Sequence, residues 1–448
     1  LPVLPIANIL AKDTVICNGD SVTLKGTGGN IFKWFNNGSL LNTSNIDTLA
    51  RNYSSWIKSE STESTLAQDG ADAYTATLRQ TPGSQGQIAT LIMGADAAWG
   101  ESQGPVAPNA LPQRSKITND IIDAIASKIE AGGKVALLLE HHGVSPEALA
   151  NASKISAKTG CRLFTGTFPA RVDGGPGNPE VERLPYFPEQ VLQTLTGLDH
   201  LVLVGGEPPA SFFAYRGIPG QLVPEGCKVS RLTQNEEDAV DALSRLADRL
   251  GAAAETVKTF ERRATPRPTG PLDTKSIIQA VAATMPAGLI VATDSGGGNA
   301  AHAYCQNAES NSWLSLTGGA IGQGGPVATD AALACPDRPV LAMLGDGGAA
   351  YTNQSFWTQA RENLNVTTLI FANHSYNILN VEYARLGVKE VGEIAASLFD
   401  IGNPELDWVA MAKGFGVQGA HAKDAEDLCR LLEESYKTPG PFVIQARA

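Results

Sequence analysis

Apolar residues follow two alternating patterns along the middle of the chain. Isoleucines at helical spacing between residues 117 and 129 predict an amphipathic helix, and the apolar run 135–140 follows as a buried strand. A second helix is expected from Ser145, with Pro146 at its first position. Further strands are expected at 161–164 and 201–206. Helices that alternate with buried strands are typical of βαβ units and predict a parallel sheet.

The last part of the chain repeats this alternation. A helix beginning at Asp273 precedes a strand at 289–294, and a glycine-rich helix start covers Gly318 to Gly325. The other expected elements are a strand at 340–344, a helix at 353–364, a strand at 366–373, a helix near 407–416 and a strand at 441–446. This pattern predicts one doubly wound domain.

The opening of the chain has a different pattern. Short β-prone runs separated by Gly/Asn turns occupy residues 13–41, among them 15–18, 21–24 and 31–35. Beyond residue 51 the α/β character returns, with an expected helix at 61–79, a strand at 88–93 and a turn at 94–99. The stretch 13–41 resembles a fragment of an immunoglobulin-like repeat of secreted bacterial proteins, which indicates a truncated or fused reading frame.

Two segments rich in proline divide the chain. Residues 261–271 combine prolines with arginines and cannot continue a helix, so they are interpreted as a linker, and 104–112 form a weaker boundary. The fold class expected is α/β, with doubly wound parallel-sheet domains. The predicted parts are a β-rich segment (1–50), a shorter α/β piece (51–108) and two full α/β domains (109–265 and 266–448).

Composition and charge narrow the functional classes. The 448 residues are 43% hydrophobic and carry a net charge of −12, which argues against nucleic acid or an anionic membrane surface as partner. We find no uninterrupted apolar run long enough to span a membrane. Six scattered cysteines predict neither a disulfide framework nor a zinc site and favour a cytoplasmic location; they are Cys17, Cys161, Cys227, Cys305, Cys335 and Cys429.

The most informative motif is Gly345-Asp346-Gly347, separated by 25 residues from Asn373. Both Asp346 and Asn373 follow hydrophobic strands, and the helix between them makes those strands parallel neighbours, so the two side chains are expected side by side. Together with the carbonyl of Ser375 they offer the hard oxygens that Mg²⁺ prefers. The glycines and the following helix start favour a bound diphosphate. A lone Gly-Asp-Gly is also a common turn.

These residues resemble the thiamine-diphosphate enzymes, whose signature is Gly-Asp-Gly, some 25 residues and then Asn. The segment 316–379 is similar throughout to the acetolactate synthase and benzoylformate decarboxylase branch. The resemblance implies three α/β domains: pyrimidine-binding, of which 51–108 would be the end, central (109–265) and diphosphate-binding (266–448). It also implies thiamine diphosphate and Mg²⁺ as cofactors, a 2-oxo acid substrate, decarboxylation or carboligation with the cofactor as electron sink, and a homodimer or homotetramer.

The same resemblance assigns site residues. Asp346, Asn373 and the Ser375 carbonyl would ligate Mg²⁺. Ile321 would hold the cofactor in its bent shape, with core packing as the alternative, and Tyr376 is either a lining residue or a core aromatic. Gly296 and Gly297 stand where relatives often carry hydroxyl groups. The expected cofactor-binding set is Ser295, Gly296, Gly319, Ile321, Gly345, Gly347, Gly348, Ala349, Ser375 and Tyr376.

The catalytic residue stays unknown at this point. The family uses a Glu in the first half of the pyrimidine-binding domain to activate the cofactor, and Glu60, Glu63 and Glu101 do not match its motif and are interpreted as surface carboxylates. We therefore expect little activity from this chain. The alternatives are a protein that binds the cofactor without catalysis, and a nucleotide- or FAD-binding α/β protein that shares only the turn.

Other candidates carry less weight. The run 201–206 ends in Gly-Gly and is interpreted as a plain turn after a strand rather than a nucleotide site, so FAD is not expected. His141 and His142 follow a strand and are expected in a loop. His302 and His374 are expected near the proposed site, and His374 could face substrate.

Overall fold

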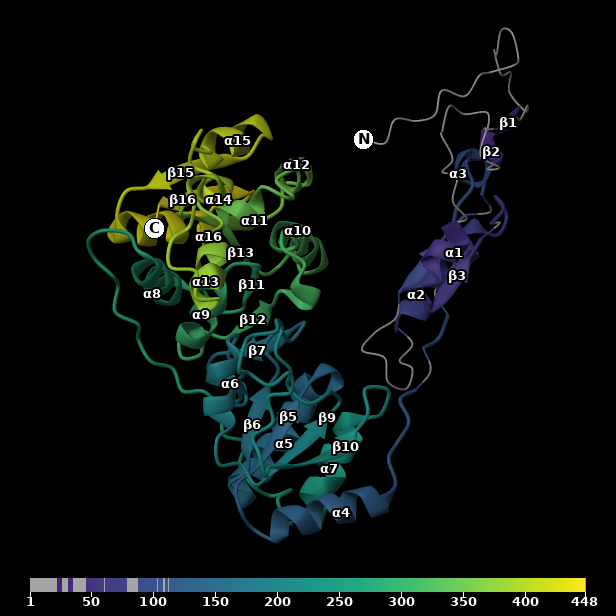
Figure 1. Ribbon diagram of the computed structural model, residues 1–448, viewed down its shortest axis with the longest axis vertical. Helices are drawn as coiled ribbons and strands as arrows, with labels where there is room; N and C mark the ends of the chain where they lie inside the picture. The colour runs from purple at the N-terminus through teal and green to yellow at the C-terminus, as the bar shows by residue number, and fades with distance from the viewer. Residues whose placement is uncertain are drawn as a thin grey trace. The chain divides into compact units, whose positions relative to one another are not determined.

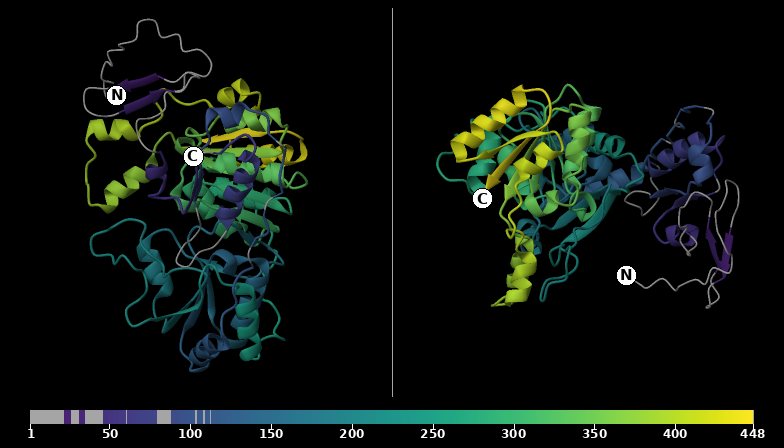
Figure 2. Two further views of the ribbon diagram at one scale, coloured as in Figure 1. Left: turned by 90° about the vertical axis from the view of Figure 1, so that its right-hand side faces the viewer. Right: turned by 90° about the horizontal axis from the view of Figure 1, so that it is seen from above.

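The computed structural model divides into two compact units, Leu1–Ser115 and Lys116–Ala448 (Figures 1 and 2). The residues that it describes are 22–25, 31–34, 46–59, 61–78, 88–102, 104–107, 109–111 and 113–447. The predicted domain boundaries near residues 50, 108 and 265 stay predictions. Among the described helices, none combines the length and apolar character that crossing a bilayer requires.

The first unit contains two small strand pairs. Its described elements are β1 (Val22–Lys25), β2 (Ile31–Trp34), α1 (Ile46–Ala50), β3 (Trp56–Lys58), α2 (Leu66–Leu78), β4 (Ala89–Leu91) and α3 (Ala95–Trp99). The β1–β2 pair is antiparallel, and β3 pairs with β4 in parallel. The predicted strand 15–18 and residue Cys17 lie outside the described residues. The predicted turn at 94–99 is wrong, because its Ala-rich sequence forms the single helical turn of α3.

The second unit opens with a five-stranded parallel sheet in the order β10-β9-β5-β6-β8. Its strands are β5 (Val135–Leu139), β6 (Arg162–Thr165), β8 (Glu182–Arg183), β9 (His200–Val204) and β10 (Lys228–Thr233). Its helices are α4 (Asn119–Glu130), η1 (His141–Val144), α5 (Pro146–Thr159), α6 (Pro188–Leu195) and α7 (Ala239–Arg249). The predicted elements are confirmed: Ile122, Ile125 and Ile129 are buried on α4, and α5 has proline at its first position.

A seven-stranded sheet follows, in the order β15-β16-β14-β13-β11-β12-β7. Its strands are β7 (Val172–Gly174), β11 (Leu289–Thr293), β12 (Asn311–Leu314), β13 (Val340–Gly345), β14 (Val366–Ala372), β15 (Gln418–Ala422) and β16 (Phe442–Arg447). All neighbours are parallel except β12 and β7. Because β7 precedes the other six in sequence by more than a hundred residues, the middle of the chain contributes a strand to the C-terminal sheet.

Helices cover both faces of this sheet. The helices are α8 (Thr274–Thr284), α9 (Gly296–Cys305), η2 (Thr317–Gly319), α10 (Gly324–Ala334), α11 (Asp346–Ala349), α12 (Ser355–Arg361), α13 (Asn377–Arg385), α14 (Glu393–Phe399), α15 (Trp408–Gly414) and α16 (Ala425–Lys437). One core contains Val281 of α8 and Leu428 of α16, and the other contains Phe356 of α12 and Trp408 of α15. A buried sheet between two helical layers is the doubly wound α/β fold that the sequence predicts.

The glycine-rich helix start predicted at Gly318 to Gly325 is too early. Helix α10 begins only at Gly324, because Gly318, Gly319 and Gly322 have φ values of 63°, 68° and 95°, which belong to the left-handed region rather than to a right-handed helix. A loop with exposed main chain therefore precedes α10, close to the carboxyl ends of the strands.

Candidate functional site

Strand order brings the two halves of the predicted metal motif together. The chain passes from β11 to β12 on one side and then returns to β13 on the other side of β11, so the strand order reverses between β11 and β13. Open α/β sheets bind ligands at such a point, outside the carboxyl ends of the strands. Asp346 directly follows β13 and Asn373 directly follows β14, and these strands pair in parallel with Gly345 opposite Phe371. The two predicted ligands thus lie at neighbouring strand ends of one sheet edge.

Asp346 is buried, with 3% of its surface exposed, and both of its carboxylate oxygens accept main-chain hydrogen bonds. Oδ1 accepts from the amide of Gly347 at 2.8 Å, and Oδ2 accepts from the amide of His374 at 2.7 Å. Burial raises the pKa of Asp346, and these two amides oppose that shift. Each carboxylate oxygen keeps a second lone pair, so the group can still ligate a cation.

The loop after β14 holds Asn373 and Ser375 in a tight turn. The side-chain oxygen of Asn373 accepts from the Ser375 amide at 3.0 Å, and His374 between them has φ of 54°. The Ile401 amide donates to the His374 carbonyl at 3.0 Å, and the Tyr376 amide donates to the Phe399 carbonyl at 2.8 Å. This loop is therefore fixed on one side by Asp346 and on the other by residues 399–401.

Asp294, at the end of β11, is a buried site residue that our sequence reasoning did not select. Its Oδ2 accepts from the amides of Gly322 at 2.9 Å and Gly324 at 3.2 Å. Its Oδ1 is buried and has no hydrogen-bond partner among the described residues. Burial raises the pKa of this carboxyl group. Its position directly after a buried strand, at the same edge as Asp346, was the available signal.

The glycines of the predicted cofactor-binding set differ in how much space surrounds them. A Cβ on Gly347 would lie 2.6 Å from the Tyr376 ring, and one on Gly348 would lie 3.2 Å from Asp294. Gly296 and Gly319 face open space, and a Cβ on Gly345 would meet only Ser295, at 3.8 Å. Tyr376 therefore packs on the Gly-Asp-Gly turn rather than in a hydrophobic core.

Ile321 and Ser295 have distinct surroundings. Ile321 is 54% exposed in the loop before α10, so its side chain is not part of a core. Ser295 is the N-cap of α9, where its Oγ accepts from the Gly298 amide at 2.9 Å. Ala349 is buried at the end of α11. Helix α11 begins at Asp346, directly after Gly345, and has four residues.

The chemistry of this site fits a cation and a diphosphate. A carboxylate, a side-chain amide oxygen and a main-chain carbonyl are oxygen ligands of the kind that Mg²⁺ takes. The unsubstituted surface at Gly296 and Gly319 gives a large anionic group access to the backbone. Within the described part of the chain, no cluster of three or more His, Cys, Asp or Glu side chains could hold a metal.

The acidic residues considered as activating acids are Glu60, Glu63 and Glu101. Glu63 and Glu101 belong to the first unit and are exposed, and Glu60 lies outside the described residues. Asp69 is the buried acid of the described residues in that unit, 6% exposed, and its Oδ1 is 3.8 Å from Lys58 Nζ.

The two glycines after β9, Gly205 and Gly206, lie directly against Glu140. A Cβ on Gly206 would clash with Glu140 Oε2, and one on Gly205 would lie 2.7 Å from the Glu140 carbonyl oxygen. Glu140 directly follows β5, and burial raises its pKa to about 7. Glycine is therefore required at 205 and 206 because the Glu140 residue occupies the space above the turn.

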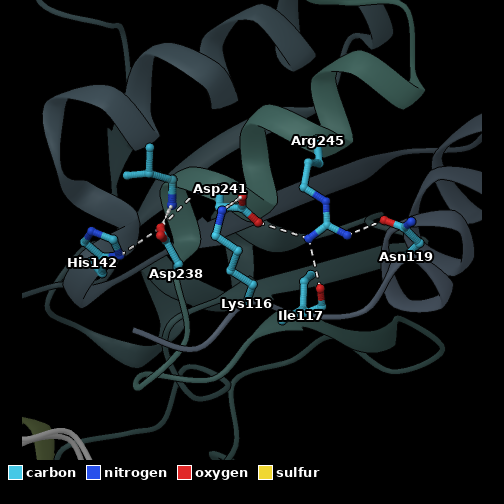
Figure 3. A network of polar contacts seen from close by, with 8 residues as sticks. Lys116, Ile117, Asn119, His142, Asp238, Asp241 and Arg245 are labelled. Atoms are coloured by element: carbon cyan, nitrogen blue, oxygen red, sulfur yellow. Dashed lines mark hydrogen bonds and ion pairs between the residues drawn. The ribbon is translucent and has the colours of Figure 1, made fainter. Parts of the chain in front are cut away.

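The histidines have structural partners. The Ala239 amide donates to His142 Nδ1 at 3.2 Å at the start of α7. Asp238 Oδ1 lies 3.8 Å from the same nitrogen (Figure 3). His142 is thus more than a loop residue, because it helps to satisfy the helix terminus. His302 is buried edge-on against Trp313 at 5.2 Å, and burial lowers its pKa to about 3. His374 Nε2 lies 3.4 Å from Glu405 Oε1.

Known proteins resemble this chain along most of its length. The family model for the C-terminal TPP binding domain of thiamine pyrophosphate enzymes matches residues 294–446. IlvX of Mycobacterium tuberculosis, provisionally named an acetolactate synthase large subunit, is 39% identical over 404 residues, which cover 90% of this chain and 76% of IlvX. Benzoylformate decarboxylase of Pseudomonas aeruginosa is 29% identical over 313 residues, 66% of this chain and 54% of that enzyme.

A solved structure shares the fold. The thiamine diphosphate-dependent 4-hydroxybenzoylformate decarboxylase of Rhodococcus jostii RHA1 superposes with a TM-score of 0.73 at 21% identity, covering 92% of this chain and 79% of that one. The identity and coverage shared with IlvX, together with the family model over residues 294–446, establish the family. The chain belongs to the thiamine-diphosphate-dependent enzymes, in the branch of acetolactate synthase and benzoylformate decarboxylase.

Proposed function

We propose that this protein binds thiamine diphosphate and Mg²⁺ and acts in decarboxylation or carboligation of a 2-oxo acid. The observation that carries the proposal is the pairing of Asp346 and Asn373 at the adjacent ends of β13 and β14, next to the point between β11 and β13 where the strand order of the sheet reverses. The names of the relatives, acetolactate synthase and benzoylformate decarboxylase, support a 2-oxo acid as substrate.

The roles we propose for individual residues are those that membership of the family implies for these positions. Asp346, Asn373 and the Ser375 carbonyl hold Mg²⁺, and Gly347, Gly348 and Ala349 contact the diphosphate. Ser295, Gly296 and Gly319 complete the surface around it, while Ile321 and Tyr376 contact the organic part of the cofactor. When bound, thiamine diphosphate supplies an electron sink for the carbanion left after loss of CO₂.

The buried carboxylates at this edge of the sheet favour the binding of a cation. Asp346 and Asp294 both lose solvation on burial, so a divalent cation at their edge would compensate negative charge that the fold has already desolvated. The amides of Gly347 and His374 orient the Asp346 carboxylate, so its geometry is set before a ligand arrives.

Domain roles are proposed likewise: 51–108 as part of a pyrimidine-binding domain, 109–265 as central domain and 266–448 as diphosphate-binding domain. We further propose a cytoplasmic homodimer or homotetramer.

The test is thermal stabilisation by the cofactor. Thiamine diphosphate with Mg²⁺ should raise the Tm of the wild-type chain by roughly 3–8 °C at a concentration near 100 times its Kd. Asp346→Ala should abolish this shift, because it removes a ligand of the cation. The matched control is Asp337→Ala, which removes an exposed carboxylate and should keep the shift. Absence of any shift in the wild type, at every Mg²⁺ concentration, would overturn the proposal.

A second candidate is cofactor binding without turnover. It is favoured by the exposed positions of Glu63 and Glu101, which leave neither of them in the buried setting that an activating acid needs. Turnover of pyruvate and benzoylformate by the chain separates the two candidates: a cofactor-dependent Tm shift without turnover favours this second one. FAD forms no part of either proposal, because Glu140 fills the glycine turn after β9.

A further inference from the structure

Helix α13 directly follows the loop that carries Asn373 and Ser375. None of its nine residues is buried, and its aromatic contact is that of the Tyr383 ring, which packs edge-on against Phe399 of α14 at 5.2 Å. A helix of this length spans about 13 Å, and its first turn is continuous with the turn that presents Asn373. Whatever holds its far end therefore limits the movement of that loop.

The far end of α13 is held by polar contacts to residues 187–215. The Tyr215 hydroxyl donates toward the Glu382 carboxylate, 3.0 Å from Oε1 and 2.9 Å from Oε2. A hydrogen bond to a charged carboxylate is among the stronger polar contacts in proteins. Tyr215 lies in the loop between β9 and β10, so the contact joins the five-stranded sheet region to the helix after the metal loop.

Arg385, one turn further along α13, is enclosed between two aromatic rings. Its guanidinium carbon lies 4.2 Å from the centre of the Tyr215 ring and 4.6 Å from that of Phe187. Its Nη2 donates to Glu189 Oε1 at 2.7 Å, and its Nε is 3.9 Å from Glu382 Oε2. The side chain is only 20% exposed, which strengthens both the cation–π and the ionic contacts.

We propose that Phe187, Glu189, Tyr215, Glu382 and Arg385 form a latch that positions the Asn373–Ser375 loop. The loop has two further attachments, the His374 amide on Asp346 and the hydrogen bonds to residues 399 and 401. The latch supplies the restraint at the other end of the helix. Its members are positioning residues, and only its consequence for Mg²⁺ rests on the proposed function.

The first test is hydrogen exchange of the cofactor-free full chain. In Arg385→Ala we expect the amides of His374, Tyr376 and Ile401 to exchange at least about ten times faster than in the wild type, because the loop loses one restraint. Tyr215→Phe removes the hydroxyl and keeps the ring over Arg385, so a smaller acceleration of the same amides is expected.

The matched control is Arg430→Ala. Like Arg385, Arg430 pairs with two carboxylates, but it lies on α16, where Asp427 is at 2.6 Å and Glu434 at 2.7 Å. Arg430→Ala should leave the exchange of the amides of His374, Tyr376 and Ile401 unchanged. If Arg385→Ala and Tyr215→Phe accelerate only amides within α13 and leave His374, Tyr376 and Ile401 as in the control, the latch holds the helix without positioning the loop, and the inference is wrong.

The second test concerns the cation. With the loop less well positioned, Arg385→Ala should raise the Mg²⁺ concentration needed for half-maximal thiamine diphosphate binding at least about five-fold, with a smaller change in the cofactor Kd at saturating Mg²⁺. An unchanged Mg²⁺ requirement contradicts the latch. A wild type that binds no cofactor contradicts the proposed function instead, and the exchange experiment then still decides whether the latch exists.

Discussion

Carboxylates at strand ends lie against glycines at two places in this molecule. Asp294 meets Gly348 at the C-terminal sheet, and Glu140 fills the space above Gly206 at the five-stranded sheet. Asp346 and Asn373 could be found from the sequence because their spacing is local information. The position of Asp294 at a strand end could also be found, but the burial of Asp294 and Glu140 could not be predicted, because it depends on loops from distant parts of the chain. Which glycines each carboxylate would meet is likewise decided by tertiary structure.

The raised pKa of Glu140 leads to a pH-dependent prediction. The pKa of Glu140 in the folded state is about 7, above the usual 4.5, so the folded protein binds this proton more tightly than the unfolded chain does. The stability of the wild type therefore falls as the pH rises from about 4.5 to about 7. Glu140→Gln removes this loss and should make the protein more stable than the wild type at pH 8, on the order of 2 kcal/mol.

Urea unfolding at pH 4.5 and pH 8 measures this difference. The exposed Glu225→Gln is the control and should give the same small difference at both values of pH. If Glu140→Gln and the wild type are equally stable at pH 8, the Glu140 carboxylate is not destabilised by burial and the prediction is wrong.

Helices and strands were predicted correctly where the local sequence alone defines them. The helix at α5 and the strand at β9 are confirmed because Pro146 and an uninterrupted apolar run define them. The start of α10 was misplaced because the conformation of Gly322 depends on the loop around Asp294. Helix α13 has no apolar face to reveal it, since none of its residues is buried.

Helix α7 offers a test of how its first turn is held. The Asp238 carboxylate accepts from the amides of Val240 at 3.1 Å and Asp241 at 3.0 Å (Figure 3). Asp238→Ala leaves these amides without that acceptor and should lower the free energy of unfolding by about 1 kcal/mol. Asp238→Asn keeps an acceptor oxygen and should lose less. Urea denaturation of both variants decides; equal losses would show that charge, and not capping, is what the residue provides.

At the scale of the whole second unit, the two large sheets share chain segments. Strand β7 lies between β6 and β8 in sequence but pairs with β12 of the C-terminal sheet, with Asp173 opposite Ser312. The Ser312 hydroxyl donates to Asp173 Oδ1 at 2.6 Å. The sequence could predict the two large parallel sheets because each has its own alternation of strands and helices. It could not predict this exchange, because three residues carry too little pattern.

We expect the two sheets to unfold together as a result. In urea titrations followed by pulsed hydrogen exchange and mass spectrometry, peptides from β5 and β13 should lose protection at the same urea concentration. Two separate midpoints would mean that β7 and the latch couple the two sheets too weakly to make one cooperative unit.

Strand β7 has a further consequence for solubility. Without it, the main-chain groups of Asn311–Leu314 would form the open border of a sheet, where another polypeptide could add a strand. The register covers Asn311, Ser312 and Trp313 with Gly174, Asp173 and Val172, and the next residue, Gly175, has a φ of 81° and lies against the main chain of Glu309. Asp173 also pairs with Arg171 at 2.8 Å, which places charge on the outermost strand. The middle of the chain thus protects the C-terminal sheet against edge-to-edge aggregation.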